Sequence, residues 1–358
     1  MNRAYRRYAL LVLIPIAAVI ILTIVMAVWI QPASNDLTRL GGYSERDFGW
    51  NKPQLAFRPP LVPIAVPTKP YEVVVIGDSF SSLRFIAPNS FRVDDGFWTD
   101  VFAQRTGIIT GAFHREDVPV PAYVASEVFK ATPPRLLIYE IVERALADLS
   151  TAGARCPAGQ DVPGPAFELR PAPMSRFPLP HFRKKFVTIE VAQIATAIDG
   201  VIKQVIRSLT GRDKTSVLRL PLSESGLFSN LISDKLLIYR GDLRKASIGP
   251  AQEAGLACYL RDLQSQVEAN GRTAFLLMVV PDKSSIYAAY APVPLMPNMA
   301  ERLSRDPGLH TIRLDVALRE AVAQGRQDVY LPDGTHWGWA GMETVADALV
   351  KRFLHDPS

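Results

Sequence analysis

The apolar run from Val73 to Ile76 constrains the fold more than any other feature, because it ends abruptly in Gly77, Asp78 and Ser79. Four branched apolar residues in succession predict a short, buried strand. A small residue directly after the strand permits a tight turn, from which the serine side chain can point into a crevice at the strand end. The sequence therefore predicts a chain organised around the turn that presents Ser79.

Short apolar segments alternate with helical patterns along much of the chain. The predicted strands, each short and rich in branched residues, are 72–76, 107–111, 135–139, 273–280 and 310–314. The predicted helices, with apolar residues three and four apart, are 96–105, 122–130, 251–270, 298–305, 315–324 and 338–354. This order predicts an α/β fold in which helices cover both faces of a parallel sheet and the site lies at the carboxyl ends of the strands.

The N-terminus carries a membrane-spanning pattern. Arg3, Arg6 and Arg7 precede an apolar run over residues 8–30 that contains no charged residue and is long enough to cross a bilayer as a helix. Because positive charge tends to stay in the cytoplasm, the rest of the chain is expected on the far side. No clear small-x-small cleavage site follows the run, which favours an uncleaved single-pass anchor, residues 1–30, in the inner (cytoplasmic) membrane with the folded domain in the periplasm.

Residues 31–70 have the composition of a linker. Six prolines lie between Pro53 and Pro70, and each removes a backbone donor and fixes φ, so an extended tether is expected. The folded domain is accordingly predicted to cover residues 71–358. Within it, residues 151–249 interrupt the alternation of strands and helices and are predicted to form an insertion, a helical cap over one edge of the sheet.

The insertion contains a long helical pattern over residues 181–209. Its pattern is amphipathic and basic, and the residues that show this are Arg183, Lys184, Lys185, Lys203, Arg207, Phe186, Ile194, Ile198, Val201 and Val205. One interpretation is contact with a membrane surface or an anionic polymer. The favoured interpretation is that the helix packs on its own domain and leaves a charged face in solvent.

Charge and cysteine content narrow the classes of function. The net charge is +5, and the 40 basic residues are scattered among 35 acidic ones without a sustained basic run, so nucleic-acid binding is not expected. The two cysteines, Cys156 and Cys258, suit either one disulfide in an exported domain or two separate buried thiols. No Cys/His cluster suggests a metal, and no cofactor is expected.

Two short motifs far apart in the chain together carry the chemistry of an acyl-transfer site. A serine hydroxyl becomes a nucleophile when a base removes its proton, and the base needs a third group that fixes its tautomer. Asp333 can orient His336 as the base for Ser79, and His336 is the one histidine of five with an aspartate three residues before it. The alternative interpretation is a turn serine and a helix-capping aspartate.

These motifs carry a family resemblance. Ser79 in G-D-S-F, and Asp333 with His336 in D-G-T-H, resemble the first and last sequence blocks of the SGNH (GDSL-like) hydrolase superfamily in their usual order. Three further segments resemble the SGNH-like domain of alginate O-acetyltransferases and related polysaccharide acetylation proteins, namely 139–144, 280–287 and 335–337. In those proteins the histidine block precedes the serine block, and the acid stands two residues before the histidine, where this chain has Gly334. The resemblance implies a three-layer α/β/α, flavodoxin-like fold.

The resemblance also implies a reaction and its partners. Ser79 is expected to take up an acyl group, by the resemblance acetyl, and to pass it to a hydroxyl of an extracytoplasmic polysaccharide. Acetyl coenzyme A is not at hand outside the cytoplasm, so a multispanning membrane acyltransferase is expected to hand the acyl group across. The alternatives are a carbohydrate or lipid O-acetyl esterase, in which water is the acceptor, and a non-catalytic scaffold of a polysaccharide export complex.

Further site residues are expected around this centre. The amide of Ser79 is predicted to bind the oxyanion, with Gly111, at the end of the second predicted strand, as the candidate glycine donor. Trp337 is predicted either to stack on a sugar ring or to lie in the core. Lys283 and Tyr287 are predicted either to bind substrate or to begin a helix after a strand.

Overall fold

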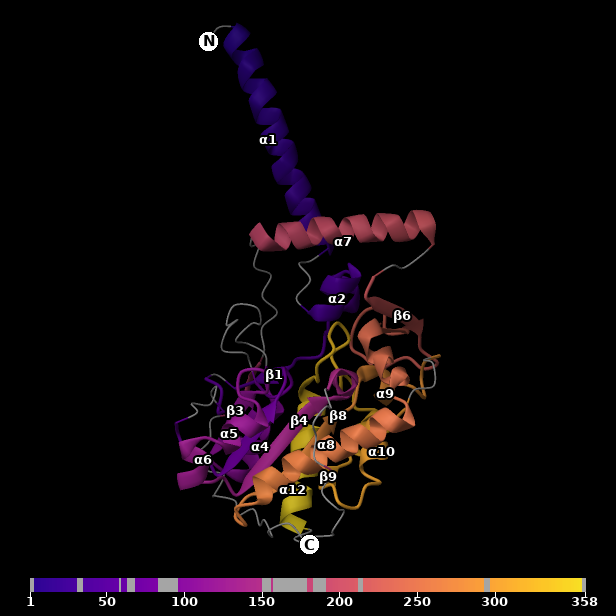
Figure 1. The fold of residues 1–358 in the computed structure, drawn as a ribbon. Coiled ribbons are helices and arrows are strands. Elements are labelled where there is room, and N and C mark those ends of the chain that lie inside the picture. Colours follow the sequence, from indigo (N-terminus) through magenta and orange to yellow (C-terminus); the bar gives the residue numbers. More distant parts are fainter. Residues whose placement is uncertain are drawn as a thin grey trace.

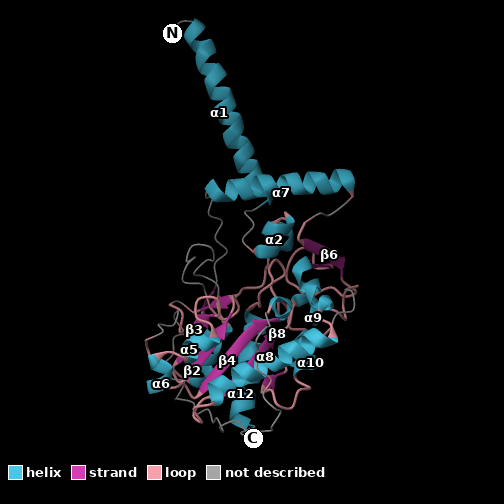
Figure 2. Ribbon diagram, viewed as in Figure 1, coloured by secondary structure: helices cyan, strands magenta, loops and turns pink. Residues whose placement is uncertain are grey.

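A five-stranded parallel sheet forms the centre of the structure (Figures 1 and 2). Its strands, in spatial order, are β3 (Thr110–His114), β2 (Val73–Gly77), β4 (Leu136–Val142), β8 (Ala274–Val280) and β9 (Thr311–Ile312). The prediction of an α/β fold with a parallel sheet is confirmed. The computed structural model describes residues 3–30, 35–57, 59–62, 68–82, 96–149, 156, 179–182, 191–211, 215–292 and 297–355.

Alternate residues of β2 enter two separate hydrophobic clusters. The helices around the sheet are α4 (Trp98–Thr106), α5 (Val120–Val124), α6 (Glu127–Ala131), α8 (Pro250–Glu268), α9 (Lys283–Ile286), α10 (Met299–Leu303), α11 (Leu314–Ala323) and α12 (Trp339–His355), with the 3₁₀ helix η1 (Glu143–Asp148). Val73 and Val75 pack with residues of α4, α11 and α12, whereas Val74 and Ile76 pack with residues of α5, α8 and α10. All four are fully buried, which explains why this run contains no polar residue.

The second predicted strand corresponds to β3, which begins three residues later than predicted. Gly107 follows α4 with φ +69°, in the left-handed region that glycine adopts readily, and so ends the helix. The chain enters the sheet only at Thr110. As a result His114, and not Gly111, lies beside Gly77 at the strand ends.

The segment predicted as an extended tether is largely folded, and the domain begins well before Tyr71. Its elements are α2 (Asp36–Gly41), α3 (Glu45–Phe48) and β1 (Leu55–Ala56). Leu37, Tyr43 and Phe48 are buried in a cluster with residues of the insertion. The prolines begin only at Pro53, so they do not prevent helices in residues 35–50, where apolar side chains find a partner surface.

The insertion is not wholly helical. Its described elements are β5 (His181–Phe182), α7 (Val191–Thr210), β6 (Val217–Pro221), β7 (Lys235–Tyr239) and the 3₁₀ helix η3 (Arg240–Ser247). β6 and β7 form an antiparallel pair, and β5 pairs with β1. Cys156 and Cys258 form a disulfide, which settles a point that the sequence left open. Residues 183–190, part of the predicted helix, lie outside the described residues.

The helix α1 (Arg3–Ile30) projects away from the sheet (Figure 1). Its residues Arg3–Val25 are long and apolar enough to span a membrane, and none of that stretch is buried against the rest of the structure. α7 lies crosswise at the end of α1, and α2 lies between α7 and the sheet domain (Figures 1 and 2).

Candidate active site

Ser79 and His336 meet at the carboxyl edge of the sheet. The Oγ atom of Ser79 lies 2.8 Å from Nε2 of His336, a hydrogen bond between residues 257 positions apart. Both side chains are partly exposed, whereas Asp78, Phe80 and Trp337 beside them are buried. The predicted nucleophile and the predicted base are therefore in contact with each other, and neither is fully buried.

Asp78 fixes the turn that carries Ser79. One carboxylate oxygen of Asp78 accepts the Phe80 N–H at 3.1 Å, and the other accepts the Val142 N–H at 3.0 Å. The first bond closes the turn around Ser79, and the second ties this turn to the end of β4. An acid at this position therefore sets where the Ser79 hydroxyl lies relative to the sheet.

Glu140 lies directly behind the turn and is fully buried. Its Oε1 accepts the Asp78 N–H at 3.2 Å, and its Oε2 accepts the indole N–H of Trp98 at 2.6 Å. A Cβ on Gly77 would lie 2.8 Å from Glu140 Oε1, so only glycine fits between this side chain and the turn. Burial, and next the negative charge of Asp78, raise the pKa of Glu140 well above its ordinary value.

Lys283 holds the loop that carries the base. Its Nζ donates to the backbone carbonyls of Leu331 at 2.7 Å, Pro332 at 3.0 Å and Gly334 at 3.3 Å. The side chain is 1% exposed, so it cannot reach a substrate in this structure, and the prediction that it binds substrate is wrong. Burial lowers the pKa of Lys283 to about 8, while the negative charge of Asp333 opposes that fall.

The same loop is bound on its other side by the first turn of α2. The carbonyl oxygen of Asp333 accepts the N–H groups of Leu37 at 3.1 Å and Thr38 at 3.3 Å. Asp36 Oδ1 accepts the Thr335 N–H at 2.9 Å, and Asp36 Oδ2 accepts the Thr335 hydroxyl. Asp333 itself is fully buried. The segment predicted as a tether thus contributes directly to the position of the predicted acid and base.

The aromatic residues predicted at the site pack in the core. The Phe80 ring lies 4.8 Å from the His336 ring and 4.7 Å from the Trp337 ring, between centroids. Trp337 is 3% exposed, so its core interpretation is right and it offers no face to a sugar. Tyr287 is fully buried and its hydroxyl accepts the Tyr330 N–H at 3.4 Å, which contradicts a role in binding substrate.

The strand register excludes one of the two predicted oxyanion donors. Gly111 pairs with Val74, three residues before Gly77, which places it about 10 Å from the strand ends. The prediction that Gly111 binds the oxyanion is therefore wrong. No hydrogen bond among the described residues uses the amide of Ser79, whereas the amide of Phe80 is bound to Asp78. The Ser79 amide thus stays available as a donor.

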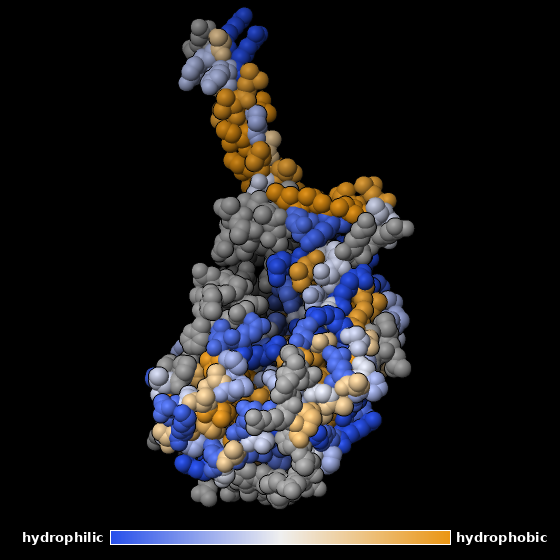
Figure 3. Space-filling model, in the orientation of Figure 1, coloured by the Kyte–Doolittle hydropathy of each residue, from blue (hydrophilic) through white to orange (hydrophobic). Residues whose placement is uncertain are grey.

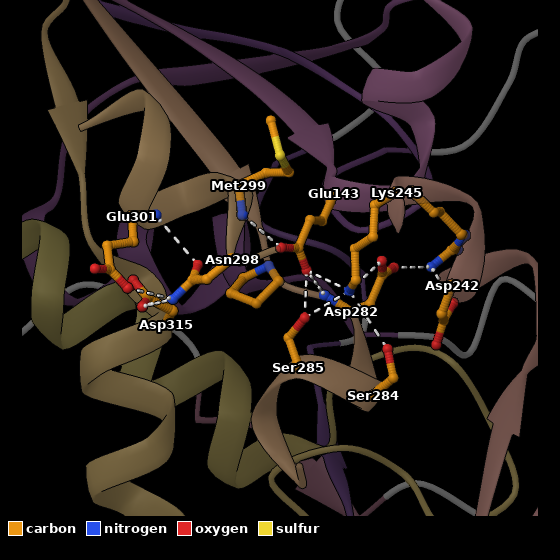
Figure 4. A network of polar contacts seen from close by, with 12 residues as sticks. Glu143, Asp242, Lys245, Asp282, Ser284, Ser285, Asn298, Met299, Glu301 and Asp315 are labelled. Atoms are coloured by element: carbon orange, nitrogen blue, oxygen red, sulfur yellow. Dashed lines mark hydrogen bonds and ion pairs between the residues drawn. The ribbon is translucent and has the colours of Figure 1, made fainter. Parts of the chain in front are cut away.

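A buried network of charged side chains fixes the ends of β4 and β8 (Figure 4). Lys245, from η3, lies 2.7 Å from Glu143 and 3.0 Å from Asp282. Arg144 pairs with Asp282 at 2.9 Å and with Asp242 at 3.5 Å. Because these groups come from two strand ends and from the insertion, the network ties the insertion to the edge of the sheet where Ser79 lies. Removal of one partner would leave a buried charge uncompensated.

The sequence did not predict the roles of three residues that position the site. Asp36 carries no motif, although Leu37 and Leu40 beside it, one helical turn apart, are a helix signal before the prolines. Glu140 interrupts an otherwise apolar strand, a sign of a buried carboxylate. Lys283 was identified as a site residue, but its length directs the ammonium into the loop and not into solvent.

Comparisons with known proteins gave no match: no family model, no curated protein and no solved structure is significantly similar to this chain.

Proposed function

We propose that the protein transfers an O-acyl group through an acyl-enzyme formed on Ser79. The observation that carries the proposal is the 2.8 Å contact between Ser79 Oγ and His336 Nε2 at the carboxyl edge of a parallel sheet. A serine is activated by a base within hydrogen-bond reach, and the proposed acid that orients this base is Asp333, which is buried in the same loop. We assign the domain to a three-layer α/β/α architecture of the SGNH type, with the serine block before the histidine block.

The reaction divides into two steps. In the first, Ser79 Oγ attacks the carbonyl carbon of the donor ester while His336 Nε2 accepts the hydroxyl proton, and the Ser79 amide donates to the developing oxyanion. The ester bond of the donor then breaks, and its leaving oxygen takes the proton from His336. In the second step an acceptor hydroxyl gives its proton to His336 and attacks the acyl carbon, which returns the Ser79 hydroxyl to its starting form.

The proposed acceptor is a hydroxyl of an extracytoplasmic polysaccharide, and the proposed acyl group is acetyl. Two observations support a location outside the cytoplasm and close to the membrane, one for each part of this proposal. The disulfide of Cys156 and Cys258 is typical of an oxidising compartment. In addition, α2 follows α1 by five residues and binds the loop of Asp333, so the site lies close to the end of the membrane-spanning pattern. A multispanning membrane acyltransferase is the proposed source of the acyl group.

The test uses the full-length protein in detergent with a chromogenic acetyl ester, with and without oligosaccharide acceptors. Ser79→Ala and His336→Ala are compared with Ser81→Ala, which removes a buried hydroxyl from the same turn. We expect turnover to be lost in the first two variants only, and acetyl to appear on the sugar.

The other outcomes separate the alternatives. Fast, Ser79-dependent release of acetate that no acceptor diverts would replace the transferase with an esterase. Turnover that survives Ser79→Ala would refute the proposal.

A further inference from the structure

One face of α7 is apolar and exposed. Of the ten large hydrophobic residues that are exposed outside α1 in the described chain, five lie on this helix: Ile198, Ile202, Val205, Ile206 and Leu209. Their spacing of three and four residues places them on one stripe. Figure 3 shows this stripe as a continuous apolar band along α7 on the side that bears α1. A contiguous exposed apolar stripe marks a surface that contacts another protein or a membrane.

The opposite face of α7 is held against α2. Lys203 Nζ donates to the carbonyl of Leu40 at 3.3 Å, and the Arg207 guanidinium donates to the carbonyl of Gly41 at 2.5 Å. The same guanidinium lies 4.3 Å from the centroid of the Tyr43 ring. The charged face therefore packs on the protein and the apolar face points outward, which is the reverse of the packing that the sequence favoured.

The position of α1 indicates what covers the apolar stripe of α7. The apolar stretch of α1, Arg3–Val25, is long enough to cross a bilayer, and its charged residues Arg3, Arg6 and Arg7 belong to its N-terminal end, which is the end away from α7 (Figure 1). α7 lies crosswise at the other end of α1, in contact with it (Figures 1 and 2). A helix that lies crosswise at the end of a membrane-spanning helix lies along the surface of the bilayer.

We infer that α7 is an interfacial helix whose apolar stripe is immersed in the lipid bilayer at the face opposite Arg3. With α1 it gives the chain two membrane contacts, one that crosses the bilayer and one that lies in its plane. The second contact fixes the rotation and height of the domain, which a single helix followed by a linker would leave free.

The helix α2 connects α7 with the site. α7 binds the carbonyl groups at the end of α2, and the start of α2 binds the loop of Asp333 and Thr335. The loop that carries His336 is therefore held at a set distance from the membrane. An acyl donor or acceptor that emerges from a membrane protein would meet the Ser79 hydroxyl in a constant orientation. The inference about α7 does not depend on the proposed reaction.

The experiment measures depth in the full-length protein reconstituted in vesicles of phosphatidylethanolamine and phosphatidylglycerol. Both native cysteines are bonded to each other, so a single added cysteine can be labelled with an environment-sensitive fluorophore. The added positions are Ile202→Cys and Leu209→Cys on the stripe. Ile109→Cys serves as the matched control, because it is an exposed apolar residue, 62% accessible, that precedes β3 at the amino edge of the sheet.

We expect the two stripe probes to emit at shorter wavelength and to be quenched at least about twofold more by brominated lipid than the control. This is the behaviour of groups buried about 5–10 Å into the boundary between headgroups and acyl chains. Leu209 is 81% exposed, so its label does not disturb packing. Quenching equal to that of the control would refute the inference. A blue-shifted emission that brominated lipid does not quench and that weakens on dilution of the protein would assign the stripe to a second copy of the chain and also refute it. Neither readout uses catalysis, so the inference about α7 stands even if the proposed reaction is refuted.

Discussion

A chain that begins at Tyr71 should fail to fold, although the sequence alone places the start of the domain there. Such a chain lacks α2, α3 and the strand β1. It also lacks Leu37, Tyr43, Phe48 and Trp50, whose exposed fractions are 0%, 4%, 3% and 7%. Burial of each of these side chains stabilises the fold by about 1.5–3 kcal/mol, which amounts to about 6–12 kcal/mol for the four. Because the whole free energy of unfolding of a typical protein is about 5–15 kcal/mol, this loss removes most of the stability.

The deletion also exposes what these residues cover. Val217 and Leu237, both fully or almost fully buried in the same cluster, would face water. The loop of Asp333 would lose the N–H groups of Leu37 and Thr38. The fold and the position of His336 should therefore fail together.

The assay compares residues 35–358 with residues 71–358 by thermal unfolding and by hydrolysis of a chromogenic ester. The longer chain should unfold cooperatively and turn over the ester, and the shorter one should be aggregated or melt at least about 10 °C lower. The point variant Leu37→Ala, in residues 35–358, should lower the free energy of unfolding by about 2–5 kcal/mol. Equal melting temperatures for the two chains would refute this reasoning.

Three further predictions follow from the contacts of the site. Asp36→Ala removes a charged acceptor from Thr335; the loss of about 1.5–3 kcal/mol of hydrogen bonding should loosen the loop and lower kcat about tenfold, whereas Asp36→Asn retains part of the activity. Turnover should fall as pH rises through about 8, where Lys283 loses its proton, and Lys283→Met should abolish this limb of the profile along with most activity. Reduction of the Cys156–Cys258 disulfide, which spans 102 residues, should lower the free energy of unfolding by about 2–5 kcal/mol, measured by denaturant titration.

The change in the free energy of unfolding with pH distinguishes a loss of activity caused by Lys283 from unfolding of the protein. The pKa in the folded protein, about 8, lies below the ordinary value of 10.5, so between these values the unfolded chain holds the proton that the folded chain has released. This group therefore makes the free energy of unfolding rise with pH in that window. A neutral amine has two N–H donors for the three carbonyl groups, so activity falls while this contribution to stability increases. A fall in both together would contradict the assignment.

Controls for the other two predictions come from the same chain. Asp234 is exposed, so Asp234→Ala measures the effect of losing one negative charge at the surface. An unchanged kcat for Asp36→Ala, or the same loss for both variants, would exclude the proposed positioning role. For the disulfide, a denaturant unfolding curve that reductant does not shift would show that the bridge adds no stability.

The sheet was predictable because its strands are locally uniform. The run Val73–Ile76 is apolar at every position, since both faces of β2 are covered, and this alone marks a central parallel strand. The contact of Ser79 with His336 followed from their motifs and from the rule that parallel strands present sites at one edge. The position of Gly111 could not be predicted in the same way, because the helix α4 ends at Gly107 and the strand begins three residues later than its apolar pattern.

Long-range packing explains what the sequence did not reveal. Leu37 and Phe48 precede a proline-rich stretch, and their cluster includes Tyr43, whose ring lies 5.1 Å from that of Phe48. The cluster is completed by Val217 and Leu237, which come from the insertion. Lys203 likewise donates to a carbonyl group 163 residues away. Local patterns identify an amphipathic helix but do not say which of its faces meets the protein.

The most direct test of the central claim is covalent labelling of the nucleophile. The full-length protein is treated with a fluorophosphonate, which reacts with activated serines, and peptides are analysed by mass spectrometry. We predict a single adduct on the peptide of Ser79, lost in His336→Ala and retained in Ser81→Ala. An unlabelled Ser79, or labelling that persists at the same rate without His336, would contradict an activated serine at this site.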